Sequence, residues 1–268
     1  MKTITLVNGS LTSHTTAIYA LEYAKQLNLS FTLAYVIDQE DPYDVENSLK
    51  DIQDLSNSYE IENNFLIFEN LLQLKQYIEA KDIDMLFCST MQNKSIYDKS
   101  FLTEILKKKI KVDIAVVKVV KIGRAYSVDK IVMPIRASKL SVKKFTLFST
   151  FSLAYSAKAE IYSVDKISKM NMASVTIENI KTKLQSVIFN LRHYLRVAKM
   201  MNFKFAIKHD YAFTEDETVQ AHIAKHGYDL IIMGGHHEKE FFWKHPIDIL
   251  FDKPMINTIY FIPFKDEL

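Results

Sequence analysis

The sequence predicts an α/β protein made of two similar doubly wound domains, each with a parallel sheet covered by helices on both faces. Three observations predict this class. Short, continuously apolar runs such as residues 230–233 are typical of strands buried on both faces. Amphipathic helical segments alternate with these runs, as the crossover connections of parallel strands require. The whole pattern then starts again near residue 131.

The first half reads as five strands separated by helices. Strands are predicted where short runs are rich in apolar and β-branched residues, at 3–7, 31–37, 65–68, 84–88 and 114–119. Helices are predicted where apolar residues recur at helical spacing, at 12–27, 45–55, 71–80 and 101–109. Ser10 or Thr12 is expected to cap the first of these helices.

The second half repeats the first with two different offsets. Its first strand is predicted at 131–135, and Ser138 corresponds to Ser10 at an offset of 128 residues. At an offset of 145 residues, Asp229 corresponds to Asp84 and Pro263 to Lys118. We therefore predict one domain at residues 1–122 and a second at 128–268, with a hinge around 120–127 that contains Gly123.

The extra 17 residues of the second half fall mainly in one long helix, predicted at about 174–201. Its apolar face is wide and extends over about seven turns, which outruns a typical strand of roughly 20 Å. We expect this helix to pack on its own sheet and also to serve contact between domains or subunits. The two domains are expected to pair within the chain, and a homodimer is a further option.

The composition excludes several classes of protein. With 34 basic and 32 acidic side chains, the net charge is +2, which predicts neither a nucleic-acid nor a membrane partner. Cys88 is the single cysteine, so no disulfide can form within the chain and a reducing compartment fits. The N-terminal apolar run is too short for a signal-peptide core, and no segment approaches a membrane helix. We therefore expect a cytoplasmic protein.

The topology places a candidate ligand cleft at one edge of each sheet. Ligands of doubly wound folds bind beyond the carboxyl ends of the strands, where the strand order reverses, and here that point lies between the first and fourth strands of each half. Two adjacent glycines after a buried strand also allow a ligand to approach the backbone closely. The candidate ligand-binding residues at these strand ends are Asn8, Gly9, Arg136, Gly234, Gly235, His236 and His237.

These strand ends resemble the universal stress protein family in its tandem two-domain form. Residues 4–10 (ITLVNGS) and 131–138 (IVMPIRAS) are similar to the family's first strand, which ends in Pro-Val-Asp-Gly-Ser. Residues 229–237 (DLIIMGGHH) are similar to Asp-Leu-Ile-Val-Met-Gly-Thr-His-Gly, and 257–264 (NTIYFIPF) to the closing strand. The resemblance implies a five-stranded parallel sheet of order 3-2-1-4-5 in each domain, dimeric or tandem assembly, and ATP binding in some members.

The nucleotide motif of the family is eroded here. ATP-binding members carry an aspartate after the first strand, where this chain has Asn8 and Arg136. They also carry Gly-x2-Gly-x9-Gly-Ser/Thr after the fourth strand. The second half keeps Gly234 and then has His237, Ile247 and Asp248 at the motif positions, and the first half has Ser89, Gln92, Leu102 and Thr103.

These replacements act against a phosphate cradle. Glycines let several backbone N–H groups point at one anion, and β-branched Ile247 cannot easily adopt such a turn. Asp248 would repel a phosphate by about 1 kcal/mol at 4 Å in water, and by more once dehydrated. We therefore expect no ATP cofactor bound in the family's manner, while a different small ligand in the cleft stays open.

A histidine cluster gives a second candidate site. His222 and His226 are four residues apart on a predicted helix and so share one face. With His236, His237 or Glu238 they could hold zinc. The alternative is a set of surface and helix-end histidines, since His226 precedes Gly227 and a cation is favoured at a helix C-terminus. We therefore assign no metal site and keep His222 and His226 as candidate ligands.

No catalytic residue is predicted. No serine or cysteine has an identifiable base and orienting partner, and Cys88 reads as an inert packed thiol. The leading hypothesis is a non-catalytic tandem universal stress protein that acts in stress response through small-ligand or protein binding. The alternatives are an ATP-binding member with slow or no hydrolysis, and a zinc-binding protein that uses the C-terminal histidines.

Overall fold

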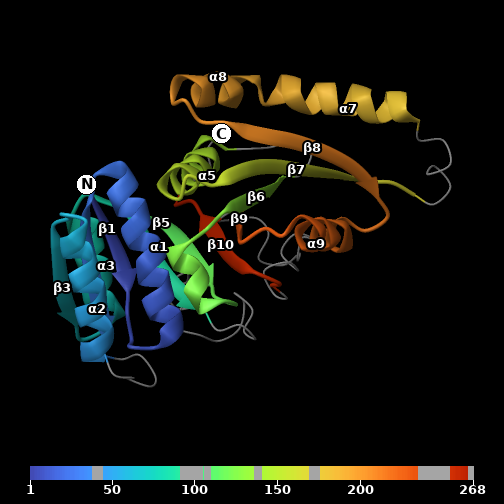
Figure 1. Ribbon diagram of the computed structural model, residues 1–268. Helices are drawn as coiled ribbons and strands as arrows, with labels where there is room; N and C mark the ends of the chain where they lie inside the picture. The colour runs from blue at the N-terminus through green and yellow to red at the C-terminus, as the bar shows by residue number, and fades with distance from the viewer. Residues whose placement is uncertain are drawn as a thin grey trace.

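In the computed structural model, the strands of the chain form one mixed sheet with helices on both faces (Figure 1). The structure describes residues 1–37, 45–90, 105, 110–135, 141–168, 176–234 and 254–264. The strands are β1 (Lys2–Leu6), β2 (Ser30–Val36), β3 (Asn63–Phe68), β4 (Ile83–Thr90), β5 (Asp113–Lys118), β6 (Lys130–Ile135), β7 (Lys158–Lys166), β8 (Phe205–Ala212), β9 (Leu230–Gly234) and β10 (Asn257–Ile262). The helices are α1 (Leu11–Leu27), α2 (Val45–Ser58), α3 (Leu71–Ala80), α5 (Val142–Ala154), α7 (Ile177–Asn190), α8 (Arg192–Met200) and α9 (Glu215–His226), with a 3₁₀ turn η1 (Ile122–Tyr126).

The strand order confirms two doubly wound halves. The order across the sheet is β3-β2-β1-β4-β5-β10-β9-β6-β7-β8, so each half has the predicted order 3-2-1-4-5 with its own strands parallel. The two halves meet where β5 and β10 pair antiparallel, with Thr258 opposite Lys118 and Ile262 opposite Ile114. Pairing of the two last strands therefore joins the halves edge to edge into a ten-stranded sheet.

Strand register tests the predicted repeat residue by residue. Lys2 pairs with Ser30 in the first half, and Lys130 pairs with Lys158 in the second, so both strands are shifted by 128 residues. Likewise Thr3 pairs with Met85, and Ile131 pairs with Leu230, which confirms the offset of 145 for the fourth strand. The last strand differs by one residue from the prediction, since Met85 pairs with Asp113 whereas Leu230 pairs with Asn257.

One hydrophobic core runs through both halves on the sheet face that carries α1, α2, α5, α7 and α8. At its centre, Phe151 of α5 packs against Tyr19 and Tyr23 of α1 and against Phe87 of β4, with ring centroids 6.0 to 6.4 Å apart. A second core lies on the opposite face under α3 and α9. Helix packing and strand pairing thus both connect the halves.

The predicted hinge is an ordered connection. Residues 122–126 form the 3₁₀ turn η1. The carboxylate of Asp229 accepts hydrogen bonds from the backbone of Asp129 and Lys130 and lies 3.3 Å from Arg124. Asp229, predicted only as the residue that opens a strand, therefore fixes the linker to the second half.

The side chain of Asn257 holds the other end of the linker. Its Oδ1 accepts from the backbone N–H groups of Val120 and Lys121, each at 2.8 Å. Its Nδ2 donates to the Tyr19 hydroxyl on α1, also at 2.8 Å. Asn257 thus connects β10, the linker and the first helix of the other half.

The predicted long helix at 174–201 is instead two helices. α7 ends at Asn190 and α8 begins at Arg192, because Leu191 departs from helical geometry with ψ of 5°. The first two residues of the predicted range lie outside the described residues. So does most of the helix predicted at 101–109, of which Ile105 alone is described, as a buried helical residue.

Candidate functional site

The loop after β1 is closed by its own side chains. Gly9 has φ of +81°, a conformation that favours glycine. The side chain of Asn8 accepts hydrogen bonds from the backbone N and the Oγ of Ser10, at 3.1 and 2.7 Å. Ser10 in turn caps α1 by accepting from the backbone N of Ser13, as predicted.

This arrangement consumes donors that an anion would need. The backbone N of Asn8 donates to Ser13 Oγ, so three N–H groups of the 8–13 loop have partners inside the loop. Helix N-termini bind phosphate through such free N–H groups. Asn8 keeps its amide nitrogen without a partner among the described residues, and Asn8 is half-buried, so it can still donate to a small ligand.

His14, near the start of α1, connects the loop region after β1 to α2 and to the linker. Its Nδ1 lies 3.2 Å from Ser48 Oγ of α2, and its Nε2 lies 3.3 Å from the Tyr126 hydroxyl of η1. Burial lowers the pKa of His14, against the opposite influence of Asp51. A largely neutral imidazole therefore ties α1 to α2 and to η1 at neutral pH. The sequence carried no signal for this contact, because the three segments meet only in the fold.

In the second half, a lysine side chain covers the glycine at the end of β9. A Cβ built on Gly234 would lie 2.1 Å from Lys144 Cε and 2.8 Å from its Nζ. Lys144 Nζ donates to the carbonyl oxygen of Gly234 at 3.4 Å. Gly234 therefore has a packing role, since the absent side chain leaves the space through which Lys144 of α5 passes. Sequence reasoning missed Lys144 because it is one of many lysines and lies 90 residues from Gly234.

Several predicted site residues lie outside the described residues. They are Arg136, Gly235, His236 and His237 among the candidate ligands, and Gln92, Leu102, Thr103, Ile247 and Asp248 among the motif positions. Ser89 is described and lies within β4. The assignments on the undescribed residues stay predictions.

A buried lysine lies at the corresponding edge of the first half. Lys118 ends β5, is fully buried, and pairs in register with Thr90 at the end of β4. Lysine is almost never fully buried without compensating contacts. The carboxyl edge of each half thus carries a lysine that the family motif does not include.

The two candidate zinc ligands lie on one face of α9, as predicted, with ring centroids 4.5 Å apart. His222 Nε2 is 2.5 Å from Glu160 Oε1, and its ring stacks on Tyr162 with centroids 3.8 Å apart. Within the described ranges, no group of three or more histidine, cysteine or acidic side chains is placed to hold a metal. His236, His237 and Glu238 lie outside those ranges, so the zinc hypothesis stays a prediction.

The network around Glu160 is compact and mostly buried. Burial alone would raise the pKa of Glu160, but hydrogen bonds from His222, Lys208 and Tyr228 outweigh it and lower that pKa to about 2. Lys208 Nζ lies 2.8 Å from Glu160 Oε2. This network connects β7, β8 and α9, and we infer that its role is to stabilise the fold.

Cys88 behaves as predicted for a packed thiol. It is a buried free cysteine in β4, and burial raises its pKa to about 12. A thiol in that state is a poor nucleophile at neutral pH. Among the described residues, no helix is long and apolar enough to cross a bilayer.

Comparison with solved structures identifies the fold. A universal stress protein from Archaeoglobus fulgidus superposes with a TM-score of 0.62 at 11% identity, covering 98% of each chain. The chain has the universal stress protein fold in its tandem form. Similar values are found for the cytoplasmic domain of a prokaryotic cation chloride cotransporter (TM-score 0.62, 11% identity, 99% and 96% covered).

A functionally unknown protein from Pseudomonas aeruginosa also superposes on the chain (TM-score 0.59, 11% identity, 98% and 92% covered). No protein-family model matches the sequence, and no curated protein matches it. Identities this low establish the fold, and they leave activity to the site itself.

Proposed function

We propose that this protein is a non-catalytic tandem universal stress protein that acts in stress response by binding a small ligand or a protein partner. The observation that carries the proposal is that the chain's own side chains contact the described strand ends where the family holds a nucleotide. Asn8, Ser10 and Ser13 take up N–H groups of the first loop, and Lys144 covers Gly234 in the second. A scaffold in that state supports binding of something other than ATP held by a glycine cradle.

A cytoplasmic location belongs to the same proposal. The single cysteine is a buried, free thiol, which accords with a reducing compartment. One protein of similar fold is the cytoplasmic domain of a transporter.

An ATP-binding protein with slow or no hydrolysis is the second candidate. One observation favours it: the Lys144 ammonium brings a positive charge to the end of β9, where the fold places ligands. An anionic ligand at the end of β9 would form a charge-assisted hydrogen bond with this ammonium.

A thermal-shift screen of nucleotides, nucleosides and small anions against the full chain tests the proposal. At about 100 times its dissociation constant, a ligand stabilises the folded state by about 2.7 kcal/mol, and each kcal/mol raises the melting temperature by roughly 2–4 °C. We expect a non-nucleotide ligand to give such a shift in the wild type and a smaller one in Asn8→Ala or Lys144→Ala. Asn190→Ala, at an exposed position outside the clefts, is the matched control.

Two results would contradict the proposal. One is a shift by ATP that depends on Lys144. The other is turnover of ATP by the wild type that Lys144→Ala abolishes, because a non-catalytic protein has no step for that variant to remove.

A further inference from the structure

A long basic segment runs from α7 through α8 into β8. Between Glu178 and Asp210 the chain has seven lysine and arginine residues and no aspartate or glutamate. The remaining 27 of the 34 basic residues share the rest of the chain with all 32 acidic ones. The net charge of +2 therefore conceals a basic segment on an otherwise acidic protein.

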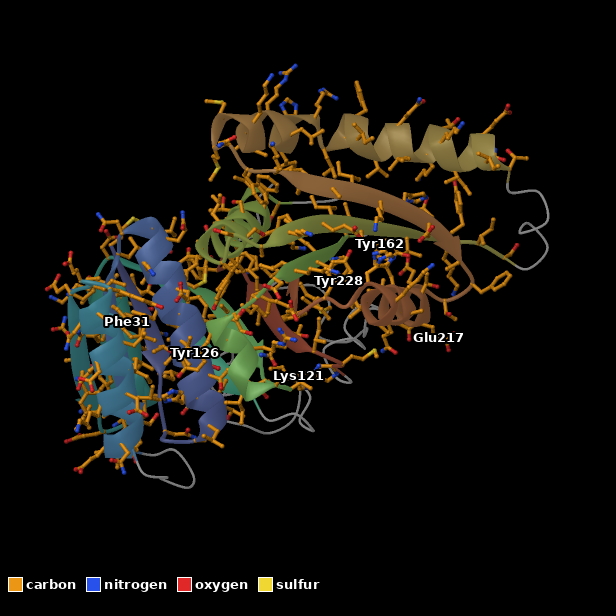
Figure 2. The ribbon with its side chains drawn as sticks, in the orientation of Figure 1. Phe31, Lys121, Tyr126, Tyr162, Glu217 and Tyr228 are labelled. Carbon is orange, nitrogen blue, oxygen red and sulfur yellow. The ribbon has the colours of Figure 1, made fainter. Side chains whose placement is uncertain are left out.

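This segment forms a straight ridge on the surface. α7 and α8 lie end to end over β8 and β7, along the side of the molecule far from the first half (Figure 1). Together they span about 36 Å at the helical rise of 1.5 Å per residue. Val187, Leu191 and Ala198 are buried toward the sheet, and side chains project outward along the whole ridge (Figure 2).

The outward side of the ridge mixes cations with apolar side chains. Phe189 and Met200 are 62% and 87% exposed, and Val197 is exposed between them. The outer patch is defined here as Phe189, Arg192, Arg196, Val197, Lys199 and Met200. By helical spacing Phe189, Arg196 and Met200 lie opposite the buried residues, and Arg192, Val197 and Lys199 lie on the flanks of the helices.

Within the part of the chain that the structure describes, no acidic side chain pairs with the cations of the outer patch. Lys183 pairs with Asp165 and Lys208 with Glu160, and both of these lie outside the patch. Arg192, Arg196 and Lys199 form no ion pair with any described residue. Arg192 instead donates to the carbonyl oxygen of Phe189 at 3.2 Å and stands over the Phe189 ring at 4.1 Å.

We propose that the outer patch docks the protein on an anionic membrane surface. Basic residues near a membrane surface attract anionic lipid headgroups, here Arg192, Arg196 and Lys199, and exposed apolar side chains beside them can enter the acyl boundary. A straight ridge also fits a flat surface. This inference goes beyond the proposed function and does not depend on the two clefts.

Other occupants fit less well. A second copy of the chain, related by two-fold symmetry, would bring two uncompensated basic patches together. Nucleic acid would satisfy the cations, but Met200 and Val197 would gain nothing from it, and Arg192 already covers the Phe189 ring. The expectation of no membrane partner came from the charge of the whole chain and from the lack of a spanning segment, neither of which describes this local patch.

Co-sedimentation of the full chain with vesicles tests the proposal. Vesicles of phosphatidylcholine are compared with vesicles that also contain about 30% phosphatidylglycerol, at roughly 0.1 M and 0.5 M salt. We expect partitioning onto the anionic vesicles to be at least tenfold stronger at low salt and to fall steeply at high salt. The triple variant R192Q/R196Q/K199Q should lose at least tenfold of this partitioning, given about a fivefold effect for each basic residue near the surface.

Two further variants serve as controls. The first tests whether binding depends on where the charges lie or only on the total charge, and the second tests the contribution of the apolar side chains. K50Q/K81Q/K158Q removes three exposed lysines elsewhere and should bind vesicles as the wild type does. Phe189→Ser with Met200→Ser keeps every charge and should weaken binding severalfold.

Any of three results would overturn the proposal. They are equal binding to neutral and anionic vesicles, equal losses in the two triple variants, and patch-dependent binding to a DNA duplex or to polyglutamate without binding to vesicles. The last result would assign the outer patch to a soluble polyanion or to another partner.

Discussion

At the scale of single residues, Gly234 fits the pattern of a ligand-binding loop in the sequence, but in the structure it provides space for the Lys144 side chain. The glycine was predicted as a point where a ligand could approach the backbone. In the structure the Lys144 side chain makes that approach. The same space is thus filled from within the protein, and a ligand that needs it must first move the lysine.

A double-mutant cycle tests this contact. Gly234→Ala should lower the free energy of unfolding by about 1 kcal/mol, because its Cβ forces Lys144 off its path. In a Lys144→Ala background the same substitution should cost almost nothing, which gives a coupling energy of similar size. Urea denaturation of the four proteins measures both values. Equal costs in the two backgrounds would show that Gly234 is required for another reason.

At the scale of elements, the Glu160 network fixes α9 to β7 and β8. The carboxylate is buried and receives His222 from the helix and Lys208 from the neighbouring strand. Hydrogen bonds to a charged group are worth more than neutral ones. This connection supplements the apolar packing of α9, and it engages the Nε2 of His222.

The lowered pKa of Glu160 predicts how stability depends on pH. Because the folded-state pKa of about 2 lies below the ordinary value of 4.5, the network stabilises fully above about pH 4.5 and loses its contribution as the pH falls toward 2. Glu160→Gln should lower the free energy of unfolding at pH 7 by roughly 2–4 kcal/mol. Denaturation curves between pH 7 and pH 3 should converge for variant and wild type. A constant difference across that range would contradict the assigned role.

At the scale of the whole molecule, the two halves share one sheet and one core. β5 pairs with β10, and Phe151 of the second half packs among Tyr19, Tyr23 and Phe87 of the first. The prediction of paired domains within the chain therefore has a specific structural form. The boundaries at 122 and 128, and a homodimer, stay predictions.

The shared core predicts that the halves unfold together. Phe151→Ala should cost about 3–5 kcal/mol, as truncation of a buried aromatic residue does. Hydrogen exchange followed by mass spectrometry should then show faster exchange in β2 of the first half as well as in β7 of the second. The control is Ser156→Ala, at an exposed position between the end of α5 and the start of β7. Faster exchange confined to the second half would show that the halves are independent.

The fold could be read from the sequence because it rests on local patterns. The strands for which ranges were predicted lie within three residues of their observed ends, since a buried parallel strand is a continuous apolar run, whereas β7 and β8 were given no ranges. The strand order came from the family resemblance, and strand register confirmed the repeat. The break at Leu191 was missed because the apolar face continues through it, so the pattern of α7 and α8 resembles one helix.

The site could be predicted only in outline. Topology predicts where the clefts lie, which stays a prediction, and the N-cap role of Ser10 followed from its place before α1 and is confirmed. Lys144 on Gly234, His14 between Ser48 and Tyr126, and the burial of Lys118 all depend on segments that are distant in the chain. Such contacts leave no periodic or motif signal, so no reading of a single sequence could supply them.

Equilibrium dialysis of the full chain against labelled ATP tests most directly whether the clefts still bind the nucleotide. Because the chain's own side chains take up the loop donors and cover Gly234, we predict no saturable binding at ATP concentrations up to about 100 μM, which corresponds to a binding free energy weaker than roughly −5.5 kcal/mol. Saturable, stoichiometric binding below that concentration, weakened by Lys144→Ala, would contradict the account.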